Sequence, residues 1–480
     1  MSSQRSERDA ASDRVERPIV AVANRLPVSK SQGKWRVSMG GLVTALRPVM
    51  ERQNGLWVGW DGGEEDVPRR VDGLDIELRS LSLTNAQLQG YYYGLANRSI
   101  WPLFHDLVEQ PVFERGWWKT YDEVNQAFAE TSEDLDFDHE APLLWVHDYH
   151  LMVLPRLLRE RHPGSPIAFF LHIPFPPPEL FARLPWREEI LTGLLGADVV
   201  AFHTERYRDN FARSVERLYP EQVAIDGRTV VLPDGRRVRT AAHPISVDAR
   251  RFAELARSEE VEEELESLRE QFAGRKVILG CDRLDYTKGI HERFQAIELL
   301  LERRSDLRGK VAFVQIAVPS REGVQEYREL RRDVERTVGR INGRFTEPGQ
   351  DVPVYYLHRG VPQQRLVAFY RLADVAAVTP LKDGMNLIAK EFVVSQDAVD
   401  GTGVLVLSEF TGAALELSDA VSCNPFDVEG LSARIEQALE MDGDEWRSSL
   451  KRMAGNVLDN DIFHWVDREL AEVEEVIAKS

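Results

Sequence analysis

Two carboxylates, Asp383 and Glu391, occur in the short stretch LKDGMNLIAKEF at residues 381–392. The stretch follows an apolar run, DVAAVTP, that is typical of a buried strand, and its Asp-Gly pair predicts a turn. Asn386 is a candidate cap for the helix that begins at LIAKEF. Asp383 and Glu391 are eight positions apart (391 − 383), about two helical turns, which is too far for them to share a proton. A capped helix with a solvated carboxylate is the alternative to a ligand site.

Cationic side chains follow another strand-like run. In CDRLDYTKGI (281–290), Arg283 and Lys288 come shortly after the apolar segment VILG. Two cations at the mouth of a sheet suit a diphosphate, particularly in a chain whose net charge is −19. Salt bridges from these cations to Asp282 or Asp285 are an equally good interpretation.

Single polar groups stand at the ends of three further strands. Arg25 in ANRLPV and Arg321 in VPSREGV are weak signals, because surface arginines are common. His172 follows the run IAFFL and begins HIPFPPPE, in which four prolines within five positions make a rigid loop. Such a loop can hold a reactive group in place. A buried histidine with a structural hydrogen bond is the alternative.

Two motifs match known kinds of ligand site only in part. HDYH (147–150) resembles a metal-ligand cluster, but no second pair of ligands has matching spacing, so we expect no metal. The simpler interpretation is a histidine bonded to backbone at a turn, with Asp148 as a helix cap. SMGGLVTALRP (38–48) places Gly40 and Gly41 before a helix, where backbone amides can approach an anion. A tight turn is the alternative, and neither GxGxxG nor GxxxxGK[ST] occurs in the chain.

The segments that carry these residues alternate between strand-like and helix-like patterns, which predicts parallel sheets covered by helices. One series runs from residue 19 to residue 203, and a second begins near residue 277, which predicts two Rossmann-like domains. AAHPISVD (241–248) is the candidate hinge, and 224–240 has the turn signals of a β-hairpin. In such sheets ligands bind at the carboxyl ends of the strands, where the polar residues above are expected. The predicted strands include LLWV (143–146), IAFFL (167–171), DVVAFH (198–203), VAFVQIAV (311–318), VYYL (354–357) and VLVLS (404–408).

Composition limits the class of protein. A chain of 480 residues with 43% hydrophobic and 29% charged residues is typical of a globular protein with two or three domains. The net charge of −19 argues against nucleic acid or an acidic membrane as a partner. Two cysteines without CxxC spacing, no signal-peptide pattern and no apolar run of about 18–20 residues favour the cytoplasm. Residues 1–18 are expected to form a disordered tail.

Ten collinear segments together resemble the trehalose-6-phosphate synthase family, which are retaining glycosyltransferases of the GT-B fold. The resemblance implies an α/β protein with two Rossmann-like domains whose parallel sheets face each other across a cleft. We expect an N-terminal domain at 19–244, a C-terminal domain at 245–458 and a C-terminal helix at 459–480 that returns to the N-terminal domain. The matching segments are ANRLPV, GGL, YYYGLANRSIWPLFH, WVHDYHLMVLP, FFLHIPFPPPE, DRLDYTKG, SREGVQEY, GRINGRF, VTPLKDGMNLIAKEFV and GVLVLSEFTGAA.

The resemblance also implies a reaction. Glucose would pass from a nucleotide diphosphate glucose to glucose 6-phosphate with retention, which makes α,α-1,1-linked trehalose 6-phosphate. The partners are then small-molecule substrates, no cofactor or metal is required, and we expect a homo-oligomer, either a dimer or a tetramer. The other interpretations are a different GT-B enzyme, such as a nucleotide-sugar epimerase, and a catalytically silent sugar-phosphate sensor. An epimerase would not need a site for an acceptor phosphate, and a sensor should have lost the charged residues of the donor site, all of which are present.

The resemblance assigns roles residue by residue. It places Arg283 and Lys288 on the donor diphosphate, Asp383 on glucose hydroxyls and Glu391 on the ribose, so that the two carboxylates grip the two ends of one donor. His172 would lie at the transferred glucose and complete the catalytic set of His172, Asp383, Arg283 and Lys288. The remaining donor-side residues are Gly40, Gly41, Val361, Gly384, Met385, Asn386 and Leu387. The acceptor phosphate falls to Arg25, Tyr92 and Arg321, and the acceptor sugar to Trp101 and Asp148.

One position departs from the family pattern. Family members often carry an aromatic or other bulky group beside the donor base, next to the YYLH strand, whereas this chain has Val361 in HRGVPQQ. The sequence therefore leaves the donor open between UDP-, ADP- and GDP-glucose.

Overall fold

The computed structural model describes residues 17–31, 34–38, 41–53, 55–63, 67–133, 137 and 141–478. Most of the tail expected at 1–18 lies outside these residues. The chain folds into two compact units. Unit 1 combines Met1–Ile245 with Ile462–Ser480, and unit 2 is Ser246–Asp461. The chain therefore passes between the units twice, after Ile245 and after Asp461.

Unit 1 is built on a nine-stranded sheet in the order β5-β4-β1-β6-β7-β8-β11-β10-β9. Neighbours from β5 to β11 run parallel, and β10 and β9 continue the sheet as the antiparallel hairpin expected at 224–240. The predicted strands at 143–146, 167–171 and 198–203 are confirmed as β6, β7 and β8. The bounds are β1 Ile19–Arg25, β4 Leu56–Trp60, β5 Glu77–Leu81, β6 Leu143–His147, β7 Ile167–Phe170, β8 Val199–Phe202, β9 Ala224–Asp226, β10 Thr229–Val231 and β11 Arg237–Ala242, with a separate hairpin of β2 Val28–Ser31 and β3 Lys34–Val37.

The helices of unit 1 include one unusual element, the π-helix η1, which covers the segment rich in tyrosine at 88–100. The last helix, α19, packs on the sheet of this unit, where Trp465 stacks on Trp145 with ring centroids 5.7 Å apart. Its buried Glu469 lies 2.5 Å from Nδ1 of His243, at the end of β11. The bounds are α2 Gly41–Arg52, α3 Asn85–Gln87, η1 Leu88–Ile100, α4 Trp101–Phe104, α5 Arg115–Thr131, η2 Tyr149–Leu151, α6 Leu154–Arg161, α7 Pro178–Phe181, α8 Arg187–Leu194, α9 Glu205–Leu218 and α19 Ile462–Ile477.

Unit 2 is built on a six-stranded, fully parallel sheet in the order β14-β13-β12-β15-β16-β17. The inner strands are buried along almost their whole length, as expected when helices cover both faces of a parallel sheet. The predicted strands VAFVQIAV, VYYL and VLVLS match β13, β14 and β16 in both bounds. The strands are β12 Lys276–Arg283, β13 Val311–Val318, β14 Val354–Leu357, β15 Val375–Val378, β16 Val404–Ser408 and β17 Val421–Cys423.

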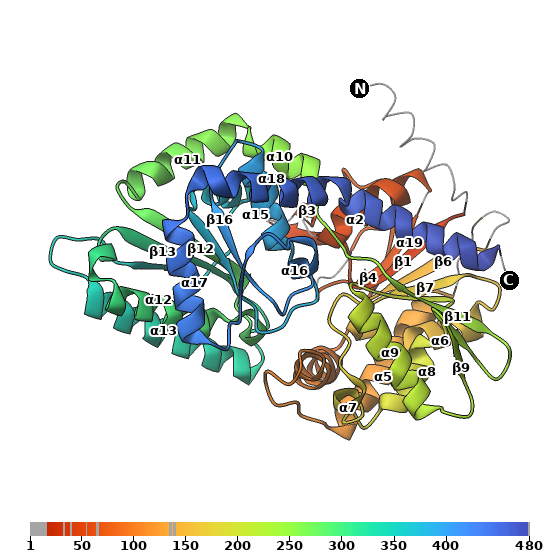
Figure 1. The fold of residues 1–480 in the computed structure, drawn as a ribbon. Helices are drawn as coiled ribbons and strands as arrows, with labels where there is room; N and C mark the ends of the chain where they lie inside the picture. Colours follow the sequence, from red (N-terminus) through yellow and green to blue (C-terminus); the bar gives the residue numbers. More distant parts are fainter. Residues whose placement is uncertain are drawn as a thin grey trace. The chain divides into compact units, whose positions relative to one another are not determined.

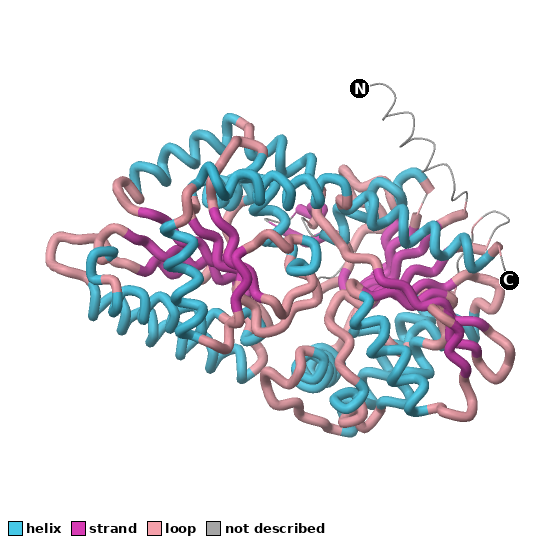
Figure 2. The backbone as a smooth tube through the Cα atoms, in the orientation of Figure 1, coloured by secondary structure: helices cyan, strands magenta, loops and turns pink. Residues whose placement is uncertain are grey.

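Two groups of helices cover this second sheet. The helices α12, α13 and α17 pack together on one side, and α10, α11, α14, α15 and α18 pack together on the other (Figure 1). Within each unit, helices flank the strands, which Figure 2 draws in magenta. The bounds are α10 Ala249–Ala256, α11 Glu259–Gln271, η3 Tyr286–Lys288, α12 Ile290–Arg303, η4 Ser305–Leu307, α13 Gln325–Phe345, α14 Gln363–Leu372, α15 Leu387–Asp397, α16 Ala413–Glu416, α17 Val428–Glu440 and α18 Gly443–Asp459.

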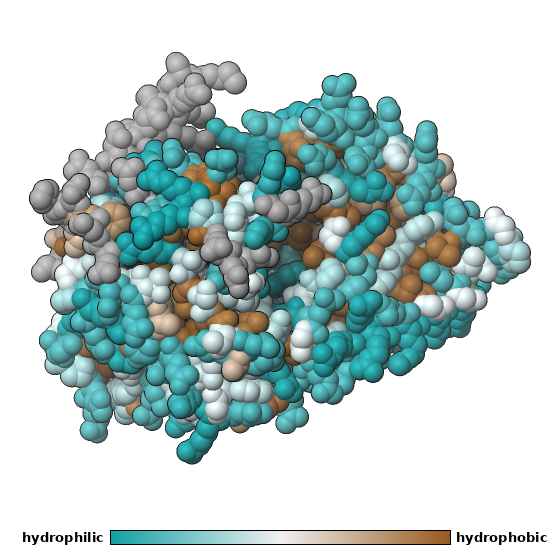
Figure 3. All heavy atoms as spheres, turned by 180° about the vertical axis from the view of Figure 1, so that it is seen from behind, coloured by the Kyte–Doolittle hydropathy of each residue, from teal (hydrophilic) through white to brown (hydrophobic). Residues whose placement is uncertain are grey.

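One face of the molecule is mainly hydrophilic (Figure 3). On the face drawn in Figure 3, most exposed atoms belong to hydrophilic residues, and hydrophobic residues show as separate patches between them. Among the described residues, the large hydrophobic side chains that remain exposed are Ile225, Leu415 and Phe426. Within the same residues, no helix combines the length and the apolar character that a membrane span requires.

Candidate functional site

One buried carboxylate organises the loop that follows β12. Oδ1 of Asp285 accepts hydrogen bonds from the backbone N–H and the hydroxyl of Thr287, at 3.0 and 2.9 Å. Its Oδ2 accepts from Arg321 at 2.8 Å and from the hydroxyl of Tyr327 at 3.0 Å. Burial alone would raise the pKa of Asp285, but the nearby cations Arg321, Arg283 and Lys288 outweigh it and lower that pKa to about 2. Asp285 therefore stays ionised and holds Arg321 beside the loop.

A glycine and a buried arginine bring three strands together. Gly289 has a φ of +60°, and a Cβ at this position would lie 2.1 Å from the carbonyl oxygen of Thr379, so that only glycine fits. The fully buried Arg293 of α12 donates to Asp282 at 2.7 Å and to Gln315 at 2.7 Å. It also donates to the hydroxyl of Thr379 at 3.0 Å. These contacts join the carboxyl ends of β12 and β15 to each other and to the middle of β13.

Lys288 and Asp383 meet at this edge of the sheet. The ammonium group of Lys288 lies 2.5 Å from Oδ2 of Asp383, so its ion pair is with Asp383 rather than with the two aspartates considered from the sequence. Nδ2 of Asn386 donates to the same oxygen at 3.1 Å, while its Oδ1 accepts from the N–H of Ala389 at 3.2 Å. The predicted cap of α15 is thus confirmed, and it also supports Asp383. The exposed Arg283 ends β12.

The loop before α15 presents a row of backbone amides. The N–H groups of residues 384–388 make no hydrogen bond to the described part of the chain, as is usual for the first turn of a helix. The loop also runs close to its neighbour, since a Cβ on Gly412 would lie 2.3 Å from the carbonyl oxygen of Gly384. Open amides at a helix N-terminus favour an anion. With Lys288 and Arg283 in the same unit, this edge of the sheet can hold a phosphorylated ligand.

Glu391 lies one turn inside α15 and has a different partner. Its Oε2 accepts a hydrogen bond from the hydroxyl of Tyr370 at 2.7 Å. Burial raises the pKa of Glu391 to about 7, although the bond from Tyr370 opposes that shift. The described contacts do not join Glu391 to Asp383, which agrees with two separate roles. Val361 lies in the loop after β14, and its described contacts do not connect it to these residues.

The raised pKa of Glu391 predicts a pH-dependent stability. A carboxyl whose pKa is 4.5 in the unfolded chain and about 7 in the folded protein favours folding only while it is protonated. Its contribution is therefore complete below pH 4.5 and is lost as the pH rises through 7. Between pH 5 and pH 8, we expect the free energy of unfolding of wild type to fall by about 2 kcal/mol relative to Glu391→Gln. Urea unfolding of both proteins at the two pH values measures this difference, and parallel pH profiles would contradict it.

In unit 1, a chain of ring contacts begins at Arg25. This exposed residue ends β1, and its guanidinium lies 4.4 Å from the ring centroid of Trp60. Trp60 in turn contacts Tyr92 at 6.2 Å, and Tyr92 stacks on His150 at 5.7 Å with only 8° between the planes. The buried Trp101 lies 5.5 Å from Tyr149, the neighbour of His150 in the chain. The structure thus gathers Arg25, Tyr92 and Trp101 of the predicted acceptor set in one unit, while Arg321 lies in the other.

Asp148 and His172 also lie together in unit 1. Asp148 follows β6 with a φ of +77°, a conformation that costs energy for a residue other than glycine and is often found at functional sites. Its Oδ1 accepts from the backbone N–H of His172 at 3.3 Å, and its side chain makes no capping bond to η2. The interpretation of Asp148 as a helix cap is therefore wrong. The carboxylate instead bridges the ends of β6 and β7.

His172 belongs to a cluster of three histidines at the ends of β6, β7 and β8. Its Nε2 lies 3.3 Å from Nδ1 of His147, and its carbonyl oxygen lies 3.1 Å from Nε2 of His203. Burial lowers the pKa of His147 to about 3. Burial and the two neighbouring imidazoles lower the pKa of His172 well below its usual value. Both rings are therefore neutral near pH 7.

The remaining predicted positions are the two glycines of SMGGLVTALRP and the possible metal site HDYH. Gly40 lies outside the described residues, and Gly41 is the first residue of α2. In the part of the chain that the structure describes, no three His, Cys, Asp or Glu side chains are grouped as metal ligands would be. The HDYH motif itself is divided, because His147 points to His172 while His150 stacks on Tyr92.

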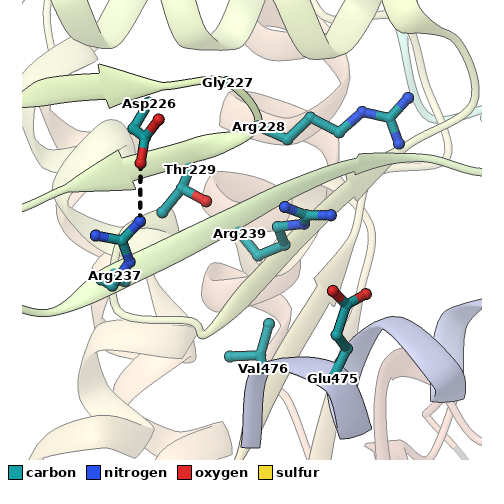
Figure 4. Close-up of a pocket in the computed structure, with 8 residues that line it drawn as sticks. All are labelled: Asp226, Gly227, Arg228, Thr229, Arg237, Arg239, Glu475 and Val476. Carbon is teal, nitrogen blue, oxygen red and sulfur yellow. Dashed lines mark hydrogen bonds and ion pairs between the residues drawn. The ribbon is translucent and has the colours of Figure 1, made fainter. Parts of the chain in front are cut away.

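A pocket of about 340 Å³ in unit 1 lies away from all these residues, between the β9–β10–β11 region and α19 (Figure 4). Its arginines are already paired with carboxylates. Arg237 bonds to Asp226 at 3.1 Å, as the dashed line in Figure 4 shows, and Arg239 lies 2.5 Å from Glu472. An anion would have to displace these partners, so we assign no ligand to this pocket. Its lining consists of Asp226, Gly227, Arg228, Thr229, Arg237, Arg239, Glu475 and Val476.

Comparison with known proteins identifies the family. The sequence model of glycosyltransferase family 20 matches residues 16–475. A trehalose-6-phosphate synthase of Mycobacterium avium (strain 104) is 44% identical over 462 residues, which span 93% of this chain and 93% of the relative. The chain belongs to glycosyltransferase family 20.

Solved structures of similar proteins agree with this assignment. An α,α-trehalose-phosphate synthase (UDP-forming) from Burkholderia xenovorans, in complex with glucose-6-phosphate, aligns with a TM-score of 0.84 at 34% identity and covers 95% of this chain and 100% of its own. A trehalose-6-phosphate synthase studied for glycosyl transfer with retention aligns with a TM-score of 0.85 at 35% identity and covers 95% and 99%. The family-20 chain thus has the GT-B fold expected from its sequence.

Several residues that shape the site of this glycosyltransferase carried no functional assignment from the sequence. Asp285 was considered only as an alternative ion-pair partner, although it stands between Arg283 and Lys288 in the chain. Trp60 is the last residue of the apolar strand β4, and this place at a strand end is a signal that could have been used. Arg293 and Tyr370 lie within helices, where no motif marks them.

Proposed function

We propose that this family-20 enzyme is a trehalose-6-phosphate synthase that transfers glucose from a nucleotide diphosphate glucose to glucose 6-phosphate with retention. The observation that carries the proposal is the cluster at the carboxyl ends of β12 and β15. It combines Lys288 bound to Asp383, the exposed Arg283 and the open amides of residues 384–388. This combination provides cations and N–H donors for a diphosphate beside a carboxylate for sugar hydroxyls.

In this proposal, Lys288 serves two partners. Its ammonium group has three N–H donors, so it can keep Asp383 in place and still reach a phosphate oxygen. Breaking the bond between glucose and phosphate puts negative charge on the leaving diphosphate. Arg283, Lys288 and the N-terminus of α15 stabilise that charge where it develops. Glu391 would accept bonds from the ribose hydroxyls, at the other end of the donor.

For the acceptor, Arg25, Tyr92 and Arg321 are the proposed ligands of the phosphate, and Trp101 and Asp148 those of the sugar. Arg25 lies over the ring of Trp60, and Tyr92 contacts the same ring, so a guanidinium and a phenol hydroxyl are both available for a phosphate. We propose attack on the same face that the phosphate leaves, with the departing phosphate oxygen taking the acceptor proton. No carboxylate nucleophile is then needed, and Asp148 and Asp383 do not act as a glycosidase-like pair. The relative studied for transfer with retention supports this stereochemistry.

Arg25→Gln is expected to raise the KM for glucose 6-phosphate about tenfold or more, because it removes a charged hydrogen bond to the phosphate, while the donor KM changes little. Arg25 is the better test of the acceptor site than Arg321, since loss of Arg321 also leaves the buried Asp285 without its cation. Arg217→Gln, which removes an exposed arginine paired with Glu179 on the same unit, is the control. Equal increases in the two KM values would contradict the assignment.

An assay with three donors tests the proposed function directly. The enzyme is incubated with UDP-, ADP- or GDP-glucose, with and without glucose 6-phosphate, and the released nucleoside diphosphate is measured. We expect release that depends on glucose 6-phosphate, with UDP-glucose among the accepted donors, because the solved relative is UDP-forming. Conversion of the donor sugar without release would instead indicate an epimerase.

A further inference from the structure

The bonding of His172 leaves one of its polar groups open. Its backbone N–H donates to Oδ1 of Asp148 at 3.3 Å, and its carbonyl oxygen accepts from Nε2 of His203 at 3.1 Å. Its Nε2 lies 3.3 Å from Nδ1 of His147. The fourth group, Nδ1 of its ring, makes no hydrogen bond to any residue that the structure describes. A ligand at this strand end would therefore meet His172 through Nδ1.

The tautomer of His203 follows from its two partners. Nδ1 of this buried ring accepts from the backbone N–H of Ile245 at 3.5 Å, so its hydrogen must lie on Nε2. That hydrogen is directed at the carbonyl oxygen of His172, which can only accept. The backbone N–H and the carbonyl oxygen of His172 are thus both hydrogen-bonded. Among the described residues, the hydrogen bond of its ring is the one with His147, so that contact decides the tautomer of His172.

The contact between His147 and His172 has two possible directions. If Nε2 of His172 donated, the hydrogen of His147 would lie on its own Nε2, which is buried and has no partner among the described residues. A buried N–H without an acceptor is rarer and more costly than an unused acceptor. If Nδ1 of His147 donates instead, only a lone pair on its Nε2 is left without a partner. The second direction is therefore favoured, and it places the hydrogen of His172 on Nδ1.

We propose that His147 is a positioning residue that donates from Nδ1 to Nε2 of His172 and so fixes His172 as a neutral ring with its hydrogen on Nδ1. This open N–H then faces the ligand as a donor to an oxygen of the transferred sugar. Only that last step rests on the proposed function, because the tautomer itself follows from contacts within unit 1. His147 is called a positioning residue because its N–H, and not the ring of His172 itself, decides which nitrogen of His172 carries the hydrogen.

Neutron diffraction from crystals of the perdeuterated protein tests the tautomer without any assay of activity. We expect deuterium on Nδ1 of both His147 and His172. Deuterium on Nε2 of either ring, or on both nitrogens of His172, would overturn the proposal. This measurement remains valid if the protein proves to catalyse a different reaction, so that a failure of the proposed function can be recognised separately.

Two substitutions at His147 separate its hydrogen bond from its packing. His147→Phe keeps a ring in the buried position but removes the N–H donor. In His147→Asn the side chain is shorter, but its Nδ2 is an N–H donor that takes the place of Nδ1. We expect His147→Phe to lower kcat about tenfold with smaller changes in both KM values, and His147→Asn to recover most of that loss. His162→Gln, which removes a histidine bonded to Ser132 rather than to His172, should leave kcat unchanged. Equal kcat values for the phenylalanine and asparagine variants would contradict a role for the donor.

Discussion

Arg283→Ala is expected to lower kcat about 10²–10³-fold, the loss that follows removal of one donor to a charge that develops in the transition state. Arg283 is the last residue of β12, directly before the loop that Asp285 organises, and lies in the same unit as Lys288 and the open amides before α15. Lys288 is partly neutralised by Asp383, so the exposed Arg283 is expected to contribute strongly to binding the charge of the leaving diphosphate.

The control for Arg283 is Arg336→Ala on α13, where an exposed arginine is paired with Asp333. Its kcat should match that of wild type, and steady-state kinetics at saturating concentrations of both substrates make the comparison. An unchanged kcat in Arg283→Ala would remove this residue from the site. Unfolding curves for both variants show whether each is fully folded under the assay conditions, so that a lower kcat is not caused by unfolded protein.

Arg293→Met is expected to lower the free energy of unfolding by about 3–5 kcal/mol, because it leaves a buried carboxylate without its cation. Methionine keeps much of the side-chain volume, so the main loss is the pairing with Asp282 and the bond to Gln315. Urea unfolding gives the difference. Adding Asp282→Asn should recover part of the loss, since the uncompensated charge then disappears.

Arg303→Ala provides the matched control on the same helix. This arginine is exposed and paired with Glu436 at 3.2 Å, so its removal should cost less than about 1 kcal/mol. Similar losses for Arg293→Met and Arg303→Ala would show that the buried network does not hold the strand ends together.

Much of the fold could be predicted because parallel strands that are covered on both faces are continuous apolar runs. VAFVQIAV coincides with β13, and the turn signals at 224–240 correspond to the turns between the antiparallel strands β9, β10 and β11. The π-helix at Leu88–Ile100 could not be predicted in this way. Its backbone is fixed by packing, since a Cβ on Gly94 would lie 2.7 Å from the ring of Trp117, and no local pattern records that contact.

The sequence predicted which residues could form the site better than it predicted which side chains they bond to. Strand ends meet at one edge of a parallel sheet, so polar residues after apolar runs are good candidates. Ion pairs depend on tertiary structure: Lys288 pairs with Asp383, 95 positions away, and Arg321 pairs with Asp285, 36 positions away. Asp148 was misread as a possible cap because its positive φ, which turns it toward the backbone of His172, cannot be seen in the sequence.

The structure of the product distinguishes the proposed reaction from its alternatives. The enzyme is incubated with glucose 6-phosphate and UDP-glucose that carries ¹³C at the anomeric carbon of glucose, and the product is examined by NMR. We expect a labelled α-anomeric carbon joined through oxygen to the anomeric carbon of a glucose that bears the 6-phosphate. A β-anomeric product, a different linkage or labelled free glucose as the only product would contradict it.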